Sequence, residues 1–344
     1  MKKPLLITMG DAAGIGPETI ARAFREAPAD LAGCVVVGDS ATLRRAASLT
    51  GAAPQLPLVQ LADLSGAAQV PPGCIPLLQK GDLAGLLPFG AVNALAGRAA
   101  GQCIVWAARE VLAGRAAAMV TAPIHKESLA AAGGQFASFP GHTETLQAEA
   151  AAFMRKSVAD VPVRMMLAND ELKTVLVSIH MSLQAAIHAV TFDNVLQTLQ
   201  ITHQALGATL GRAPRIGVAG LNPHAGEGGL FGSEEQAIIA PAIAAARAAG
   251  LDVHGPFAPD TVFMRARHTA AKPGEFDVVV AMYHDQGLIP VKYLGVEQGV
   301  NVTLGLPLIR TSPDHGTAFD IAGTGKADAS SLIAAVRMAR KLSS

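Results

Sequence analysis

Short, continuous apolar runs recur along the 344-residue chain, and longer helix-like stretches separate them. Continuous apolar runs are typical of strands that are buried on both faces, as in a parallel sheet. The runs that we interpret as strands are residues 5–9, 34–37, 116–120, 174–179, 216–219 and 277–282. The stretches 93–112, 182–206 and 233–249 predict helices. An alternation of this kind predicts an α/β fold.

The composition excludes several classes of protein. Lys and Arg number 27 and Asp and Glu number 27, so the formal net charge is zero. Nucleic-acid binding and docking to anionic membranes both normally need a basic excess, and we expect neither partner. The longest apolar run, residues 237–246, is too short for a membrane span, which needs about 20 residues. Three scattered cysteines without a C-x-x-C pair predict free thiols in a reducing, cytoplasmic compartment.

Three of the strand-like runs lead to a histidine, namely His180, His224 and His284. Ligands of open α/β sheets bind at the carboxyl ends of the strands. Three imidazoles delivered to that edge can bind one divalent cation and leave positions open for a substrate. Asp285 is placed to orient a neighbouring imidazole, whereas Asp260 lies in a Pro-rich turn, where it either acts with the site or caps the turn.

A second group of residues indicates an anionic substrate. His142 and Thr143 open a helical run, and the N–H groups at a helix start favour phosphate or carboxylate. Lys292, Asn301 and Arg310 follow the third strand and its downstream loop. Arg offers a bidentate fork to a phosphate and Lys a point charge. The alternative for each of them is an ordinary solvated surface residue.

The sequence has no standard dinucleotide-binding fingerprint. Gly14 and Gly16 form a G-x-G, but Thr19 stands where the third glycine belongs, and no phosphate-binding loop of the G-x-x-x-x-G-K-[ST] type occurs. If NAD binds, the best candidate segment is 314–325. Its candidate cofactor-binding residues are Asp314, His315, Gly316, Gly323 and Gly325.

Taken together, segments 10–18, 121–126, 141–144, 222–229, 283–287 and 301–325 resemble the 4-hydroxythreonine-4-phosphate dehydrogenase family over nearly the whole chain. The resemblance implies an isocitrate/isopropylmalate dehydrogenase-like α/β fold, in which two α/β/α domains flank a cleft and the chain crosses between them. We expect residues 1–123 and 300–344 in the first domain and residues 124–299 in the second. It also implies a homodimer with the active site at the subunit interface.

The family's functional positions match residues of this chain. The resemblance implies that His180, His224 and His284 bind one divalent cation (Zn, Mg, Co or Mn), with the third ligand coming from the partner subunit. It implies NAD or NADP near segment 314–325. The implied substrate contacts are His142, Thr143, Lys292, Asn301 and Arg310. We expect Lys292 to act as the general base, with Asp260 or Asp285 nearby.

The resemblance implies NAD-dependent oxidation of 4-phosphohydroxy-L-threonine to the 3-keto acid, with decarboxylation to 3-amino-2-oxopropyl phosphate, in pyridoxine biosynthesis. Residues 7–11 and 139–140 resemble instead a sister branch that oxidises 4-phospho-D-threonate or 4-phospho-D-erythronate. A relative that oxidises a cis-dihydrodiol of terephthalate is disfavoured, because Lys292, Asn301 and Arg310 suit a phosphate. Two further alternatives need no redox cofactor: a metal-dependent hydrolase and a non-catalytic binder of phosphorylated metabolites.

Overall fold

The chain folds into two compact units in the computed structural model, which describes residues 3–51, 56–81, 83–139 and 141–344. Unit 1 comprises Met1–Pro162 and Leu306–Ser344, and unit 2 comprises Val163–Gly305. The expected α/β fold, with the chain crossing twice between two units, is therefore confirmed. Residue 140, which carries part of the resemblance to the sister branch, lies outside the described residues.

Both crossings fall later in the chain than the expected positions near 123 and 300. The first is displaced because helix α7 (His142–Met154) packs against α4 (Ala94–Leu112) of unit 1, where the guanidinium of Arg109 pairs with Glu149 at 2.7 Å. The second is displaced because strand β11 (Val300–Leu304) pairs with β6 (Arg164–Ala168) inside unit 2. The long-range packing of α7 and β11 thus decides where the two units begin and end. Hydrophobic periodicity in the sequence reports local structure and does not predict such packing.

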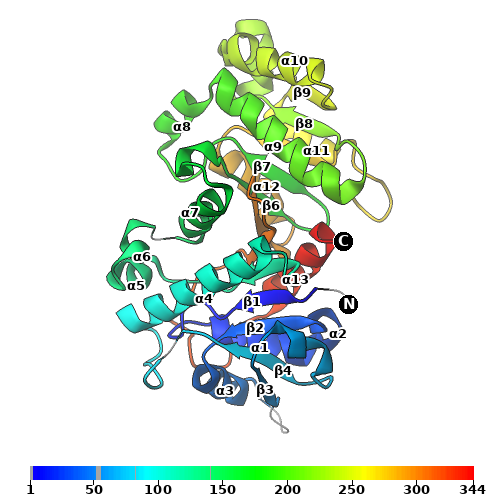
Figure 1. The fold of residues 1–344 in the computed structure, drawn as a ribbon. Coiled ribbons are helices and arrows are strands. Elements are labelled where there is room, and N and C mark those ends of the chain that lie inside the picture. Colours follow the sequence, from blue (N-terminus) through cyan, green and yellow to red (C-terminus); the bar gives the residue numbers. More distant parts are fainter. Residues whose placement is uncertain (1–2, 52–55, 82, 140) are drawn as a thin grey trace. The chain divides into compact units, whose positions relative to one another are not determined.

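Unit 1 contains a sheet in the order β3-β4-β2-β1-β5-β12, in which neighbouring strands run parallel (Figure 1). Its strands are β1 (Leu5–Thr8), β2 (Cys34–Gly38), β3 (Leu58–Leu61), β4 (Ile75–Gln79), β5 (Ala118–Thr121) and β12 (Arg310–Pro313). The core is aliphatic: Leu6, Val35 and Met119 of the sheet are fully buried together with Ile104 of α4.

Two helices of unit 1, α3 (Ser40–Leu49) and α4, begin where a polar side chain satisfies free backbone N–H groups. Asn93 accepts from the N–H groups of Leu95 and Ala96 at the start of α4, and Asp39 accepts from Thr42 at the start of α3. The remaining helices are α1 (Gly16–Glu26), α2 (Pro28–Leu31), α5 (Lys126–Ala131), α6 (Gln135–Ser138) and α13 (Ser330–Leu342).

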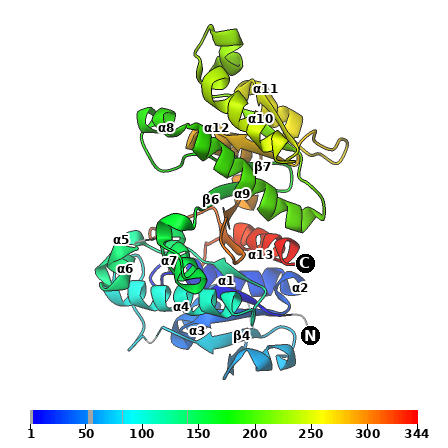
Figure 2. The same ribbon diagram turned by 45° about the horizontal axis from the view of Figure 1, so that its top comes forward.

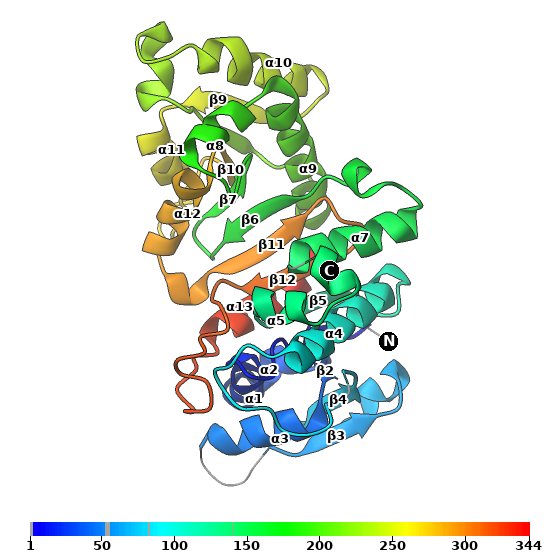
Figure 3. The ribbon, with the colours of Figure 1, turned by 90° about the vertical axis from the view of Figure 1, so that its left-hand side faces the viewer.

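Unit 2 contains strands in the order β11-β6-β7-β10-β8-β9. Strand β6 is antiparallel to both β11 and β7, and the other neighbouring strands run parallel (Figure 3). The further strands of this unit are β7 (Lys173–Leu176), β8 (Ile216–Ala219), β9 (Val253–Phe257) and β10 (Val278–Ala281). The adjacent parallel strands β7, β10 and β8 therefore present their carboxyl ends at one edge.

The stretch 182–206, expected as one helix, is two helices, α8 (Leu183–Ala189) and α9 (Phe192–Leu210). The division follows from two caps, because Ser182 accepts from the N–H of Ala185 and Thr191 accepts from the N–H of Asn194. Helix α9 packs beside α10 (Ala240–Ala248), as Figure 2 shows. The remaining helices of unit 2 are α11 (Pro259–Ala266) and α12 (His284–Tyr293).

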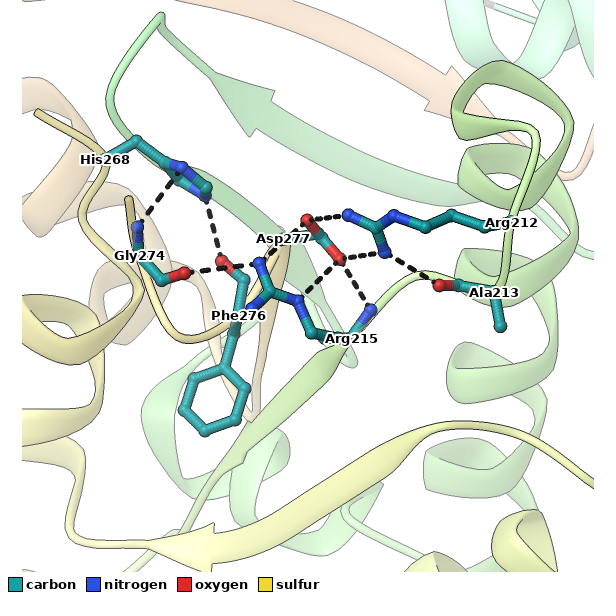
Figure 4. A network of polar contacts seen from close by, with 7 residues as sticks. All are labelled: Arg212, Ala213, Arg215, His268, Gly274, Phe276 and Asp277. Carbon is teal, nitrogen blue, oxygen red and sulfur yellow. Dashed lines mark hydrogen bonds and ion pairs between the residues drawn. The ribbon is translucent and has the colours of Figure 1, made fainter. Parts of the chain in front are cut away.

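Asp277 ties the starts of β8 and β10 together (Figure 4). Its carboxylate accepts from the guanidinium of Arg212 at 2.8 Å and from the backbone N–H of Arg215 at 2.7 Å, and the Arg215 guanidinium also donates to it. His268 lies in the loop beyond α11, where its ring contacts the carbonyl of Phe276. The network lies at the amino ends of the two strands, opposite the edge that carries the histidines.

Free cysteines and helix lengths agree with the expectations from composition. Cys34 and Cys103 are buried, which raises the pKa of each thiol to about 12, and Cys74 is half-buried; all three are free. Within the part of the chain that the structure describes, no helix combines the length and apolar character that a membrane span requires.

Candidate active site

His180 and His284 lie together beyond the carboxyl ends of β7 and β10. Their ring centroids are 5.6 Å apart, and both rings line a cavity of about 230 Å³ that Tyr283 and Asp285 also line. His284 is the first residue of α12, so the strand-to-helix turn after β10 fixes its position. The predicted convergence of these two histidines is therefore present within one chain.

Two of the three predicted metal ligands each have a carboxylate on the same ring nitrogen. The Nδ1 atom of His284 lies 2.7 Å from Oδ1 of Asp285, and the Nδ1 atom of His224 lies 2.8 Å from Oε2 of Glu227. A carboxylate accepts from a protonated Nδ1, which leaves Nε2 as the nitrogen with a lone pair for a metal. This arrangement fits the donor chemistry of a divalent-metal site.

His224 lies in a second, larger cavity. This cavity of about 680 Å³ is lined by His224 and Asp260, and it shares Tyr283 and Asp285 with the cavity of His180 and His284. Among the described residues, no three His, Cys, Asp or Glu side chains gather closely enough to hold a metal ion. A single chain thus brings two of the predicted ligands together and leaves the third apart.

The three candidate general bases occupy different positions in unit 2. Asp285 is the partner of His284, which favours an orienting role for its carboxylate. Asp260 is exposed in the first turn of α11 and faces the cavity of His224. Lys292 is half-buried in the last turn of α12, the helix that His284 begins. Asn301, a predicted substrate contact, is half-buried on β11 opposite Leu167.

Arg310, a predicted anion-binding residue of unit 1, is buried and lies close enough to His142 to act on its charge. Arg310 is the first residue of β12 and only 5% exposed, and its Nε and Nη2 atoms donate to Oγ1 of Thr121 at 3.0 and 2.7 Å. Burial lowers the pKa of Arg310 to about 10, against the opposing charge of Glu144. A buried guanidinium whose Nε and Nη2 atoms are fixed by Thr121 is a rigid cation of the kind that binds anions.

His142 begins α7, as predicted, with Thr143 half-buried beside it. Burial, together with the positive charge of Arg310, holds the pKa of His142 well below its usual value. The Nε2 atom of His142 is buried without a hydrogen-bond partner. At neutral pH the ring is therefore neutral, and it has a buried nitrogen to offer to a ligand.

The candidate cofactor segment, residues 314–325, is fastened to α1 by a buried carboxylate. Glu18 is 1% exposed and accepts from the backbone N–H groups of Gly323 and Gly325, the latter at 3.0 Å. These two N–H groups are thus already engaged, and the glycines would serve a cofactor by close backbone approach rather than as donors. The N–H of Asp314 donates to Ser331, His315 is half-buried, and Gly316 is exposed.

Sequence reasoning gave no role to two residues at the carboxyl ends of β1 and β5. Asp11 is 1% exposed, and burial raises the pKa of its carboxyl despite the nearby His125. The ring of His125 stacks on that of Phe319, within the candidate cofactor segment, with centroids 4.7 Å apart. The signal was available, since Asp11 and His125 each lie in the loop that follows a strand-like run.

Comparison with known proteins decides the family. A family model described as pyridoxal phosphate biosynthetic protein PdxA matches residues 30–339. The chain belongs to the PdxA family. A curated PdxA-family relative from Beijerinckia indica, named 4-hydroxythreonine-4-phosphate dehydrogenase, is 51% identical over 98% of this chain and 95% of its own length. Another, from Cupriavidus necator, named D-threonate 4-phosphate dehydrogenase, is 45% identical over 98% of this chain and 96% of its own.

Solved structures agree with this assignment. The crystal structure of 4-hydroxythreonine-4-phosphate dehydrogenase from Klebsiella pneumoniae matches with a TM-score of 0.86 and 41% identity, over 100% of both chains. A terephthalate 1,2-cis-dihydrodiol dehydrogenase from Burkholderia xenovorans matches with a TM-score of 0.64 and 28% identity, over 99% of this chain and 98% of that one. This PdxA-family member is accordingly a dehydrogenase, an oxidoreductase that acts on a CH–OH group.

Proposed function

We propose that this PdxA-family dehydrogenase oxidises 4-phosphohydroxy-L-threonine to the 3-keto acid, which loses CO₂ to give 3-amino-2-oxopropyl phosphate. The observation that carries the proposal is the pair of imidazole–carboxylate contacts, His284 with Asp285 and His224 with Glu227. They occur in a chain 51% identical to a protein named for this substrate. Such carboxylates orient metal-binding histidines and raise their basicity.

The proposed metal ligands are His180, His224 and His284, through Nε2 for the latter two. A divalent cation held there supplies stabilisation of the negative charge that develops on the substrate oxygen and, after CO₂ leaves, on the enolate. Imidazole ligands suit zinc and similar transition-metal ions, whereas magnesium and manganese prefer oxygen ligands. Because no three His, Cys, Asp or Glu side chains gather closely enough to hold a metal among the described residues of one chain, we propose that the partner subunit of a homodimer completes the site.

Oxidation removes a hydride from the carbinol carbon and a proton from its oxygen. NAD⁺, or NADP⁺, accepts the hydride when bound. Lys292 is the proposed acceptor of the proton, with Asp260 as the alternative. Asp285 is already hydrogen-bonded to His284, and its proposed part is to hold that ring. Segment 314–325 is the proposed cofactor site, because Glu18 fixes it and His125 stacks on its Phe319.

The proposed contacts of the phosphorylated acid in unit 1 are Arg310, His142 and Thr143. Arg310 offers a buried cation, and the neutral His142 offers a hydrogen bond from a nitrogen that has no partner within the protein. In unit 2, the proposed contacts are Lys292 and Asn301. A phosphate is a better ligand for these residues than the dihydrodiol of terephthalate, which carries no such group.

Exposed apolar side chains surround the two cavities and support the proposed homodimer. Tyr293 is 90% exposed, Met264 70% and Ile289 62%, and Leu183 and Met181 are 59% and 47% exposed. Met264 and Ile289 line the cavity of His224, and Met181 and Leu183 line that of His180. Apolar surface of this extent normally meets a partner, and the second copy is the one that a shared metal site requires.

The proposed location is the cytoplasm, since the three free cysteines fit a reducing compartment. A dehydrogenase that draws on a soluble pool of NAD fits the same compartment.

The second candidate substrate is D-threonate 4-phosphate, because relatives 45% and 43% identical to the chain carry its name. The deciding experiment compares the two phosphorylated acids under identical conditions, with NAD⁺ or NADP⁺ and a divalent metal, by absorbance at 340 nm. Trapped CO₂ is counted in parallel.

Faster reduction of NAD⁺ with 4-phosphohydroxy-L-threonine, at one CO₂ per NADH, is the expected result. A higher kcat/KM with D-threonate 4-phosphate would move the enzyme to the second candidate. Release of inorganic phosphate without NAD⁺ would identify a hydrolase and overturn both.

A further inference from the structure

The loop that carries His224 has an unusual backbone. His224, Ala225, Gly226, Glu227 and Gly228 all have positive φ angles, at 52°, 54°, 81°, 44° and 68°. The left-handed region is sterically unfavourable for a non-glycine residue, and three of these five residues are not glycine. A strained loop of this kind keeps its shape only where surrounding groups hold it.

The group that holds this loop is Glu235, in the π-helical turn Glu235–Ile239 that precedes α10. Glu235 is 3% exposed, and its Oε1 atom accepts from the backbone N–H groups of Leu221 and Asn222, both at 2.7 Å. Its Oε2 atom accepts from Nδ2 of Asn222 at 3.0 Å. A buried carboxylate thus takes both consecutive donors at the start of the His224 loop.

The loop is shaped around this carboxylate. A Cβ atom added at Gly226 would lie 2.7 Å from Oε2 of Glu235, and one added at Gly220 would lie 3.0 Å from Oε1. The carboxylate of Glu235 therefore lies so close to the loop backbone that a side chain at either glycine would crowd it. Glu235 contacts the loop on both sides of His224 in the sequence, at Gly220–Asn222 and at Gly226.

We propose that Glu235 is the positioning residue that holds the imidazole of His224 where it can bind the divalent cation. The proposal rests on the proposed function, in which His224 is a metal ligand. Glu227 contacts Nδ1 of His224 and so orients the imidazole ring. Glu235 instead fixes the backbone of the loop that carries both His224 and Glu227. The assignment is specific to Glu235, because the hydrogen bond of its neighbour Glu234 with this loop is to the side chain of Asn222 and not to the backbone of Leu221 or Asn222.

Glu235→Gln removes the charge and turns one acceptor oxygen into a donor that faces Nδ2 of Asn222. Loss of a group that supports a metal ligand from outside the coordination sphere typically weakens metal binding about 10- to 100-fold. We expect that range in the Kd for Co²⁺, titrated calorimetrically into the metal-free dimer. Amide hydrogen exchange at Leu221 and Asn222 should accelerate in the same variant. Glu234→Gln is the matched control and should leave the Co²⁺ affinity within about twofold of the wild type.

The outcomes separate this inference from the proposed function. Unchanged Co²⁺ affinity in Glu235→Gln, when His224→Ala has lost it, overturns the positioning role alone. Equal Co²⁺ binding by wild type and His224→Ala overturns the proposed function. A lower melting temperature with undiminished affinity of the folded Glu235→Gln protein means a purely structural role and also overturns the inference.

Should Glu235→Gln fail to fold, Glu235→Asp tests the same contact, because it keeps the charge but draws the carboxylate back from the N–H groups of Leu221 and Asn222. Weaker Co²⁺ binding in that variant supports the positioning role, and unchanged binding overturns it.

Discussion

Replacing Asp277 by Asn should destabilise unit 2 by about 2–3 kcal/mol. Asp277 is 8% exposed and accepts from two guanidinium groups and one backbone N–H. Hydrogen bonds to charged groups contribute about 1.5–3 kcal/mol each, and breaking a buried ion pair costs about 3–5 kcal/mol. The side chains of Arg212 and Arg215 are 50% and 39% exposed, so water recovers part of that loss.

The dependence of this loss on pH has a definite sign. Burial alone would raise the pKa of Asp277, but the hydrogen bonds and charges of Arg212 and Arg215 outweigh it and hold the pKa well below its usual value. A carboxylate whose pKa is lowered by folding stabilises the protein above its unfolded pKa of about 3.9 and loses that contribution as the pH falls. The difference between wild type and variant should therefore be full at pH 7 and shrink below about pH 4.

Urea unfolding of the two proteins between pH 7 and pH 3 measures this difference. Glu275→Gln is the control, because it breaks the exposed ion pair with Arg265, which should contribute little. Asp277→Asn should keep its kcat when folded, since the network lies at the amino ends of the strands whose opposite ends carry His224 and His284. Equal stability at pH 7, or a difference that grows as the pH falls, would refute the reasoning.

Three further predictions concern the site. Arg310→Ala should raise the KM for the phosphorylated acid roughly 30- to 100-fold with little change in kcat, because it removes a charge-assisted contact present in the ground state and the transition state alike. An unchanged KM in steady-state assays would show that Arg310 does not bind the phosphate. The pKa of His142 is lower in the folded protein than in the unfolded chain, so protonation as the pH falls favours unfolding. His142→Gln lacks this group and should therefore lose less stability than the wild type between pH 7.5 and 5.5. Equal losses of melting temperature in the two proteins over this pH range would contradict this. Tyr293→Asp should raise the dimer dissociation constant at least tenfold in sedimentation equilibrium, because a charge would replace an exposed aromatic side chain at the proposed interface. An unchanged dissociation constant would show that Tyr293 is not part of the interface.

The sequence predicted β1, β2, β5, β7, β8 and β10, because a short, continuous apolar run between turn residues is typical of a strand buried on both faces. Strands β3, β4, β6, β9, β11 and β12 were not predicted. Each predicted strand run overlaps an observed strand, for example 216–219 and β8. The helix break at Thr191 was missed because two capping residues within one apolar stretch look like ordinary polar positions on a helix surface. The domain boundaries were missed because the pairing of β11 with β6 is a long-range event.

The sequence could predict which residue types form the candidate site, but not the contacts and backbone conformations that hold them in place. Histidines after strands are visible in a sequence, and His180 and His284 meet as the strand order requires. The contact of Glu18 with Gly323 and Gly325 joins residues about 300 positions apart, and no local pattern reports it. The positive φ angles of the His224 loop are likewise invisible, since Ala225 and Glu227 are not residues that favour that conformation.

The central claim is that the three histidines bind one divalent cation in a dimer. Anomalous diffraction from crystals of the Co²⁺-loaded protein tests it most directly. We predict a single cobalt peak per active site, within about 2.2 Å of Nε2 of His224 and Nε2 of His284 and in contact with His180, with ligands drawn from both subunits. A fully loaded crystal with cobalt bound elsewhere, or bound through the Nδ1 atoms that face Glu227 and Asp285, would contradict the account.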